Sequence, residues 1–477
     1  MKILQLMPAV PASNGGGGQV RTFHFSRALA EMGELTMCIL SSNGRGTPSV
    51  ELVRICRTIL QPMDRFNADA TQYRRSMGGI RRAISILGTP WRHHGRHLMI
   101  AAEGNSKPRT ETSEACGKIL YRWYAALLRA EVRIFHRVFR FLPAIALIHD
   151  EEFEELLPEI ERNYSDGKPD VIWVEYSYLY PYALRLKHLF PNALIACNAH
   201  NVEWLFIKRL AGMAKTASSR NWWIISSSIV RKWERRMLED SDLVFACSDV
   251  DASHFRALVP EATDRIKVSP NGVDTKNFQP SASRNGEPRL LFTGSAGYGP
   301  NDDAVAWFMQ EIFPLIRQRL PEVHLCLAGL NAALHWTSFA ETTSGVEIAS
   351  DVPDMRPYFD QASVCVVPLR AGSGTRLKIL EAMGMGRAVV ATGMGAEGIE
   401  AIDGIHYLRA DTAEEFANAV IGLLTDPSKR SAMEAVSREL VCKQYDWSKI
   451  SAEAVGVLKM AVSSQSSRES ECHTGRL

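Results

Sequence analysis

The sequence VCVVPLRAGSGTRLKILEAM, residues 364–383, decides the fold. Its first residues form a continuous apolar run, which predicts a strand buried on both faces and ending at Pro368. A glycine-rich loop follows, and a helical pattern begins near Thr375. Strand, glycine loop and helix in this order are typical of parallel α/β sheets, in which ligands bind at the carboxyl ends of the strands.

The same alternation runs through the chain. Continuous apolar runs predict strands at residues 3–7, 35–40, 171–175, 194–198 and 243–247, and then at 289–293, 323–328, 364–368 and 388–391. Helical patterns lie between them, for example at residues 20–32 and 304–319. The fold class is therefore α/β, with doubly wound, mainly parallel sheets.

A turn-rich stretch at residues 271–288 interrupts this alternation and predicts a linker between two Rossmann-like domains. We expect the N-terminal domain to span residues 1–270, with a basic helical insert at about 60–165, and the C-terminal domain to span 289–444. A helix at 445–462 is expected to pack back on the N-terminal domain. The Ser-rich and charged residues 463–477 are expected to form a disordered tail.

The charge balance excludes some functions. The 477 residues carry 55 Lys+Arg against 53 Asp+Glu, which argues against a dedicated nucleic-acid binder. Between residues 74 and 140, however, fourteen basic residues oppose four acidic ones. Arginines recur there at helical spacing, so this segment is either a basic amphipathic helix lying on an anionic membrane or the solvated face of an ordinary helix. A second basic segment surrounds Trp222 and Trp223.

The nine cysteines are scattered without a C-x-x-C pair, which favours a reducing compartment. The N-terminal apolar run is too short for a signal peptide, and no run reaches the length of a membrane span. We therefore expect a cytoplasmic protein, with peripheral association on the inner face of the plasma membrane left open.

Two glycine loops are candidate ligand sites. Gly17 and Gly18 follow the first strand and would allow close approach of a phosphate or acceptor, although a flexible turn explains a lone glycine run equally well. The second loop contains Gly372, Ser373, Gly374 and Thr375, and it lies before the cations Arg376 and Lys378. Backbone N–H groups at a helix start, together with these cations, would bind a diphosphate.

Four acidic or basic side chains have alternative interpretations. Glu381, two turns into the helix, can accept hydrogen bonds from two ribose hydroxyls or serve a structural salt bridge. His200 follows the strand at 194–198 and would face an interdomain cleft, although a lone histidine is more often structural. Asp249 and Asp251 match a metal-binding D-x-D pattern, but their position after Ser248 favours a helix cap.

The whole chain resembles the retaining GT-B glycosyltransferases of family 4, the glycosyl transferases group 1. The matching pieces occur in the family's order at residues 15–18, 199–201, 269–274, 291–294, 345–353, 380–392 and 445–447. The Gly-Ser-Gly-Thr-Arg-Leu-Lys loop is similar to that of a subgroup associated with exopolysaccharide synthesis. The resemblance implies two Rossmann-like domains whose mainly parallel sheets face each other across an interdomain cleft.

The chain departs from the family pattern at two places. Glu381 matches the second glutamate of the usual Glu-x7-Glu pair, but Ser373 stands where the first would be. The loop at 295–302 also lacks the arginine and lysine that many members carry, and we hypothesise that Arg376 and Lys378 compensate.

The resemblance implies a nucleoside-diphosphate sugar donor, most simply a UDP-sugar, that binds the C-terminal domain near Gly294, with no divalent metal required. His200 would contact the donor sugar, and a glycan or lipid-linked acceptor would bind the N-terminal domain. Two alternatives stay open: a sugar-nucleotide epimerase of the same architecture, and a non-catalytic nucleotide-sugar-binding partner, which the missing first glutamate favours. Glu397 is a further, weaker site candidate.

Overall fold

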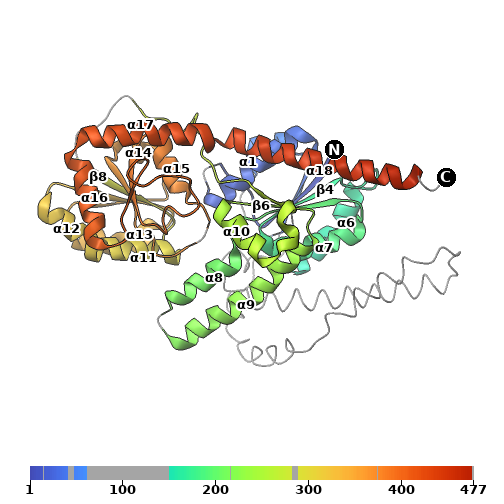
Figure 1. Cartoon of the computed structure of the whole chain (residues 1–477), viewed down its shortest axis with the longest axis horizontal. Helices are drawn as coiled ribbons and strands as arrows, with labels where there is room; N and C mark the ends of the chain where they lie inside the picture. Colours follow the sequence, from blue (N-terminus) through green and yellow to red (C-terminus); the bar gives the residue numbers. More distant parts are fainter. Residues whose placement is uncertain are drawn as a thin grey trace.

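The computed structural model contains two α/β domains, each built on a parallel sheet (Figure 1). It describes residues 1–13, 15–40, 48–61, 150–214, 216–281, 288–372 and 374–474. The basic segment at residues 74–140 and Ser373 lie outside the described residues. The predicted fold class is confirmed.

The N-terminal sheet has the strand order β3-β2-β1-β4-β5-β6-β7. Its strands are β1 (Lys2–Met7), β2 (Glu34–Ile39), β3 (Thr58–Leu60), β4 (Val171–Glu175), β5 (Leu194–Asn198), β6 (Leu243–Ala246) and β7 (Ile266–Val268). The order reverses between β1 and β4, so the carboxyl ends of these two strands mark the topological switch point at which α/β sheets bind ligands.

The C-terminal sheet has the order β10-β9-β8-β11-β12-β13, with its switch point between β8 and β11. Its strands are β8 (Arg289–Thr293), β9 (His324–Gly329), β10 (Val346–Ser350), β11 (Val364–Val367), β12 (Ala388–Ala391) and β13 (Leu408–Arg409). The sequence patterns did not predict β3, β7, β10 and β13. Three of these are too short to show a periodic pattern, and the edge strand β10 is only partly buried.

Helices cover both faces of each sheet. The N-terminal domain contains α1 (Gly17–Met32), α2 (Val50–Ile55), α6 (Asp150–Asn163), η3 (Ser177–Leu179), α7 (Tyr180–Leu189), α8 (Glu203–Gly212), α9 (Ala217–Asp240), α10 (Asp249–Leu258) and η4 (Pro260–Arg265). The C-terminal domain contains α11 (Gly299–Trp307), the π-helix η5 (Phe308–Ile312), α12 (Phe313–Arg319), α13 (Ala332–Thr342), α14 (Arg356–Gln361), α15 (Leu377–Gly384), α16 (Ala413–Thr425) and α17 (Pro427–Gln444). Among the helices of the described residues, none combines the length and apolar character that a membrane span requires.

Two expected helices differ from the structure. The helix expected at residues 304–319 is instead the run α11, η5 and α12, because Pro314 lacks the N–H that would continue a regular α-helix. The basic insert expected to reach about residue 165 stops earlier, since α6 belongs to the domain core. Phe153, Leu156 and Ile160, one helical turn apart, are buried against the sheet.

A C-terminal helix, α18 (Trp447–Thr474), returns from the C-terminal domain and packs along α1 of the N-terminal domain (Figure 1). Trp447 is 2% exposed, and its ring stacks on His24 with centroids 5.0 Å apart and meets Phe25 edge-on at 6.4 Å. This aromatic contact anchors the end of the chain to the first domain.

The helix continues to Thr474, so the expectation of a disordered tail from residue 463 is wrong for residues 463–474. Ser463 and Ser464 donate their hydroxyls to the carbonyls of Lys459 and Met460, one turn earlier. Such bonds let serines remain within a helix although they often favour turns.

The chain crosses between the domains twice, and the two crossings lie against each other. The Val273 N–H donates to the Tyr445 carbonyl at 2.8 Å, and the Trp447 N–H donates to the Val273 carbonyl at 3.2 Å. A Cβ at Gly272 would come within 2.8 Å of the Tyr445 oxygen, so only glycine fits this contact.

Replacing Trp447 by alanine tests the anchoring of α18. We expect Trp447→Ala to lower the free energy of unfolding of the N-terminal domain by about 3–5 kcal/mol, because it removes a fully packed aromatic side chain. Urea titration followed by circular dichroism measures the loss. Met460→Ala, at a side chain of α18 that is 65% exposed, should change it by less than about 0.5 kcal/mol. Equal stability of the two variants would show that Trp447 does not anchor α18 to the N-terminal domain.

Candidate functional site

The two domains meet where the predicted loops converge. A Cβ at Gly374 would lie 2.5 Å from Asn201 Oδ1 and 3.0 Å from the His200 carbonyl oxygen, and a Cβ at Gly17 would lie 3.3 Å from Leu377 Cδ1. The glycine loop before α1, the residues after β5 and the loop before α15 therefore form one site between the domains. Sequence patterns singled out all three segments separately.

The loop before α15 needs its glycines. Gly372 has φ +135° and Gly374 has φ +71°, a backbone region that disfavours residues with a Cβ. Helix α15 begins after Arg376, and no side chain caps its first N–H groups. These N–H groups and the positive end of the helix dipole are suited to an anionic ligand.

Lys378 and Glu381 lie on the first turns of α15. Lys378 Nζ donates to Asn301 Oδ1 at 3.0 Å and lies 4.3 Å from the centroid of the Phe292 ring. Burial, reinforced by Arg376, lowers the pKa of Lys378 to about 7. Burial also raises the pKa of Glu381 to about 7, against the opposing charge of Lys378. Both side chains therefore titrate near neutral pH.

The surroundings of these two side chains favour a ligand. Within the described part of the chain, the Glu381 carboxylate makes no hydrogen bond or ion pair, although it is partly exposed. Gly294, at φ +158°, passes beside Lys378, where a Cβ would come within 2.9 Å of Nζ. The predicted site residues Gly294, Lys378 and Glu381 are thus neighbours.

The Arg376 side chain stabilises the loop before α15. Its Nη1 donates to the Gly374 carbonyl, and a Cβ at Gly372 would lie 2.7 Å from its Nη2. Burial lowers the pKa of the guanidinium, and the nearby Tyr298 and Glu397 oppose that effect. In this structure Arg376 shapes the loop to which a diphosphate would bind.

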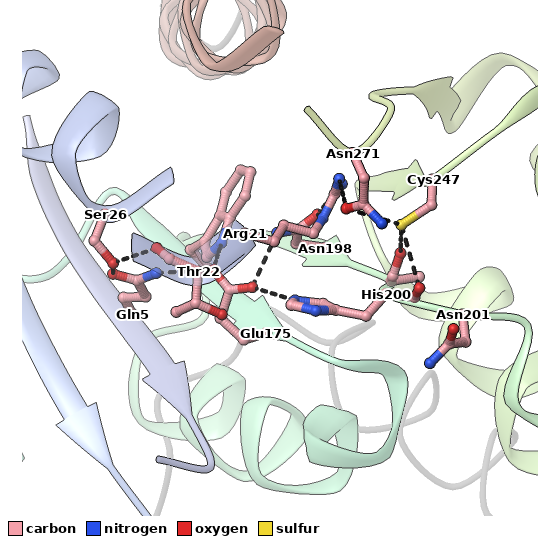
Figure 2. A network of polar contacts seen from close by, with 12 residues as sticks. Gln5, Arg21, Thr22, Ser26, Glu175, Asn198, His200, Asn201, Cys247 and Asn271 are labelled. Atoms are coloured by element: carbon pink, nitrogen blue, oxygen red, sulfur yellow. Dashed lines mark hydrogen bonds and ion pairs between the residues drawn. The ribbon is translucent and has the colours of Figure 1, made fainter. Parts of the chain in front are cut away.

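On the opposite side of the site, a carboxylate is buried at the end of β4 (Figure 2). Glu175 has no exposed surface, and four side-chain nitrogens lie within hydrogen-bonding distance of it: Gln5 Nε2 (2.8 Å), Trp173 Nε1 (2.7 Å), Asn198 Nδ2 (2.9 Å) and His200 Nε2 (2.7 Å). Burial alone would raise the pKa of Glu175, but the bonds from His200, Trp173 and Gln5 hold it below its usual value. The carboxylate is therefore ionised.

His200 is held rigidly beside this carboxylate. The ring is 5% exposed and stacks on Tyr176, with centroids 3.7 Å apart and planes inclined by 17°. Burial lowers the pKa of His200, and Glu175 opposes this without reversing it, so the imidazole is neutral. A Cβ at Gly18 would lie 1.7 Å from Tyr176 Oη and 3.3 Å from His200 Nδ1, so Gly18 is needed where α1 approaches the rings.

Arg21 extends this network from Asn198 to Asn271, as Figure 2 shows. It is 1% exposed and donates to Asn198 Oδ1 from Nε and Nη2, at 3.0 and 2.6 Å, and to Asn271 Oδ1 at 3.1 Å. Asn271 Nδ2 in turn donates to the Thr375 carbonyl at 3.2 Å. Thr375, a predicted donor-binding residue, also donates its hydroxyl to the Cys247 carbonyl.

Sequence analysis missed Arg21 and Glu175. The available signals were a single arginine between the apolar residues of α1 and an acid that ends the otherwise apolar strand VIWVE. A buried charge at the carboxyl end of a parallel strand is a recognisable mark of a site.

Two weaker predictions have structural explanations. Glu397 accepts both terminal nitrogens of Arg209 of α8, at 2.5 and 2.7 Å, in an ion pair that joins the domains, and Arg209 also donates to the Gly372 carbonyl. Asp251 N–H donates to Ser248 Oγ at 3.0 Å and Ser248 Oγ donates back to the carboxylate, so Asp251 belongs to the N-terminal cap of α10. The described residues contain no cluster of three or more metal-ligating side chains.

The chain is similar to known proteins in sequence and in fold. Residues 287–426 match the family described as "Glycosyl transferases group 1", and residues 77–277 match "Glycosyltransferase Family 4". The chain belongs to the family 4 glycosyltransferases. Among solved structures, the chain is similar to sucrose-phosphate synthase from Thermosynechococcus elongatus, with a TM-score of 0.64 and 16% identity over 97% of this chain and 100% of the other. The Anabaena protein HepE, solved with UDP and glucose, has a TM-score of 0.56 and 12% identity over 96% and 100%.

Curated relatives match part of the chain. A phosphatidyl-myo-inositol mannosyltransferase from Mycolicibacterium smegmatis is 29% identical over 41% of this chain and 52% of the relative. An uncharacterised protein in the cps region of Klebsiella pneumoniae is 21% identical over 34% and 43%. This chain spans about half the length of the curated relatives that it matches.

The pKa values of Lys378 and Glu381 predict how ligand affinity depends on pH. We expect the charged form of Lys378 and the ionised form of Glu381 to bind UDP-glucose, whose diphosphate does not titrate near neutrality. Affinity should therefore peak near pH 7. Above this pH Lys378 must take up a proton, and below it Glu381 must lose one, so affinity falls by up to about tenfold per pH unit on each side.

Calorimetric titration from about pH 5.5 to about pH 8.5 measures this profile. Lys378→Gln should flatten the alkaline side and Glu381→Gln the acidic side. Lys429→Gln, at an exposed position of α17, should leave the profile unchanged. If the affinity of the unmodified protein for UDP-glucose did not change with pH, the roles given to Lys378 and Glu381 would be wrong.

Proposed function

We propose that this glycosyltransferase moves a sugar from a UDP-sugar to a glycan or lipid-linked acceptor, with retention of the anomeric configuration. The observation that carries the proposal is the convergence of an uncapped helix start, Lys378 and Glu381 from one domain with the buried neutral His200 from the other. HepE was solved with UDP and glucose, which makes UDP-glucose the first donor to test.

Each group has a task in this proposal. The N–H groups at the start of α15 and the cation of Lys378 bind the diphosphate and stabilise the charge that it gains on leaving. Glu381 accepts the ribose hydroxyls, and His200 contacts the donor sugar. Interdomain contacts around Gly374 exclude water from the sugar, which limits hydrolysis of the donor. The resemblance implies that this chemistry needs no divalent metal.

A direct assay tests the proposal against the two alternatives. The purified protein is incubated with radiolabelled UDP-sugars and a membrane extract, and products are separated by chromatography and analysed by NMR. Transfer that retains the anomeric configuration supports the proposal. A new sugar nucleotide without transfer would identify an epimerase, and unchanged donor despite binding would identify a non-catalytic partner. Lys378→Ala should weaken UDP-glucose binding by about tenfold or more, since it removes a cation from the diphosphate.

We further propose a role in exopolysaccharide or cell-surface polysaccharide synthesis at the inner face of the plasma membrane. The cps-region relative and the mannosyltransferase named for a phosphatidylinositol acceptor support it. On the α8–α9 hairpin, which projects from the N-terminal domain (Figure 1), Ile224 and Ile225 are 47% and 45% exposed. From Trp204 to Trp233 the sequence contains basic residues but no acidic ones. This combination suits an anionic membrane.

Flotation on vesicles tests the membrane proposal. We expect binding to vesicles that contain phosphatidylglycerol but not to pure phosphatidylcholine, with loss of binding at high salt. Ile224→Glu with Ile225→Glu should abolish flotation, while Leu334→Glu, at a 79% exposed leucine of the other domain, should not. Equal flotation of both variants would reject the hairpin as the contact, and absence of binding at every salt concentration would reject the membrane.

A further inference from the structure

We propose that Glu175 is a positioning residue that fixes His200 in one tautomer, so that His200 Nδ1 presents a lone pair to a hydroxyl of the donor sugar. This inference rests on the proposed function, because it names the contact through which that function would recognise the sugar. Glu175 itself contacts no ligand in this proposal, because four side-chain nitrogens already occupy its two oxygens.

The identity of the other partners fixes the proton between Glu175 and His200. Trp173 Nε1 can only donate. Trp173 therefore fixes Glu175 as the acceptor of this bond. Gln5 Nε2 also lies 2.8 Å from Glu175, but its neighbour Ser26 can donate or accept, and the Ser26 hydroxyl also lies 2.8 Å from the Thr22 carbonyl, so Ser26 does not fix the Gln5 amide.

Asn198, unlike Gln5, has a fixed orientation. Its Oδ1 accepts from the Arg21 guanidinium, which can only donate, so its Nδ2 must face Glu175. Two certain donors, Trp173 and Asn198, and a pKa below the usual value leave Glu175 ionised. An ionised carboxylate can only accept, so His200 Nε2 carries the proton in their 2.7 Å hydrogen bond.

The opposite ring nitrogen is then a hydrogen-bond acceptor. His200 is neutral and already holds its one ring proton at Nε2, so Nδ1 carries a lone pair. Within the described part of the chain, this buried nitrogen has no hydrogen-bond partner. A protonated Nδ1 would be a buried donor without an acceptor, which is the costlier state.

The unused lone pair lies beside the start of α1, which borders the interdomain site. Nδ1 lies next to Gly18, at the start of α1, and the carbonyl of the same histidine lies beside Gly374 of the donor loop. Stacking on Tyr176 prevents the ring from rotating away. A nucleotide sugar offers hydroxyls and a base N–H as donors, whereas its diphosphate only accepts. With the ribose assigned to Glu381 of the other domain, a hydroxyl of the transferred sugar is the donor that we assign to His200.

Glu175→Gln tests the positioning role. An amide at this position can turn its NH₂ towards His200 Nε2, which favours the other tautomer and converts Nδ1 into a donor. Transfer should then fall by on the order of 100-fold or more in kcat, as expected for a histidine held in the wrong tautomer. UDP affinity should remain, because the nucleotide binds the C-terminal domain. Glu203→Gln, at a buried glutamate three residues from His200 that does not bond to it, is the matched control and should keep kcat within about twofold.

The tautomer is observed directly by NMR of the protein labelled with ¹⁵N-histidine, with His200 assigned through His200→Asn. Without ligand we expect a protonated Nε2 and an unprotonated Nδ1, and addition of UDP-glucose, but not UDP, should shift the Nδ1 resonance. A protonated Nδ1, or a resonance that UDP-glucose leaves unchanged, would overturn the inference. Because the NMR measurement does not require sugar transfer, it can fail or succeed independently of the proposed function.

If Glu175→Gln does not fold, the variants His200→Asn and His200→Gln test which ring nitrogen of His200 is needed. Asparagine places an amide oxygen near the position of Nδ1, whereas glutamine places an amide nitrogen near that of Nε2. His200→Asn should therefore retain more transfer than His200→Gln. The reverse order of the two His200 variants would overturn the positioning role. An unchanged kcat in Glu175→Gln would also overturn it, as would a parallel loss of UDP binding and melting temperature in that variant.

Discussion

The buried carboxylate of Glu175 is the interaction around which the N-terminal half of the site is organised. Removing a carboxylate from water costs several kcal/mol unless hydrogen bonds replace the lost hydration, and here four donors do so. Those donors come from β1, β4, β5 and the residues just after β5, so the carboxylate joins the carboxyl ends of neighbouring strands. Because each donor has further partners, the position of the His200 ring follows from the whole network.

The second constraint is the close approach of the two domains. Glycines at positions 17, 18 and 374 lie where a larger residue would strike the opposite loop or an aromatic ring. The Arg209–Glu397 ion pair and the bonds of Thr375 and Asn271 hold the domains at this distance. A site shared in this way can bring a nucleotide held by one domain against groups fixed in the other and exclude water as it closes.

Much of this arrangement could be predicted from local patterns. Continuous apolar runs located the long buried strands, and the segment at 364–383 predicted a strand, a glycine loop and a helix in the observed order. Residues such as His200 and Gly18 were recognisable because ligands bind parallel sheets at the carboxyl ends of strands. Their proximity follows from the topology.

The rest depends on contacts between distant segments. Arg21 and Glu175 are separated by most of the N-terminal domain in sequence, and nothing local shows that Asn198 lies between them. The strands β3 and β13 are too short to produce a pattern. The long C-terminal helix escaped prediction because its serines, which often favour turns, bond back to the preceding turn.

The central claim is that a nucleotide sugar bridges the start of α15 and the lone pair of His200. A crystal structure of the protein with UDP-2-fluoroglucose, an analogue that transfers slowly, tests it most directly. The account predicts the diphosphate on the first N–H groups of α15, the ribose against Glu381 and a sugar hydroxyl within about 3 Å of His200 Nδ1. A nucleotide bound elsewhere, or a sugar that leaves Nδ1 without a hydroxyl partner, would contradict it.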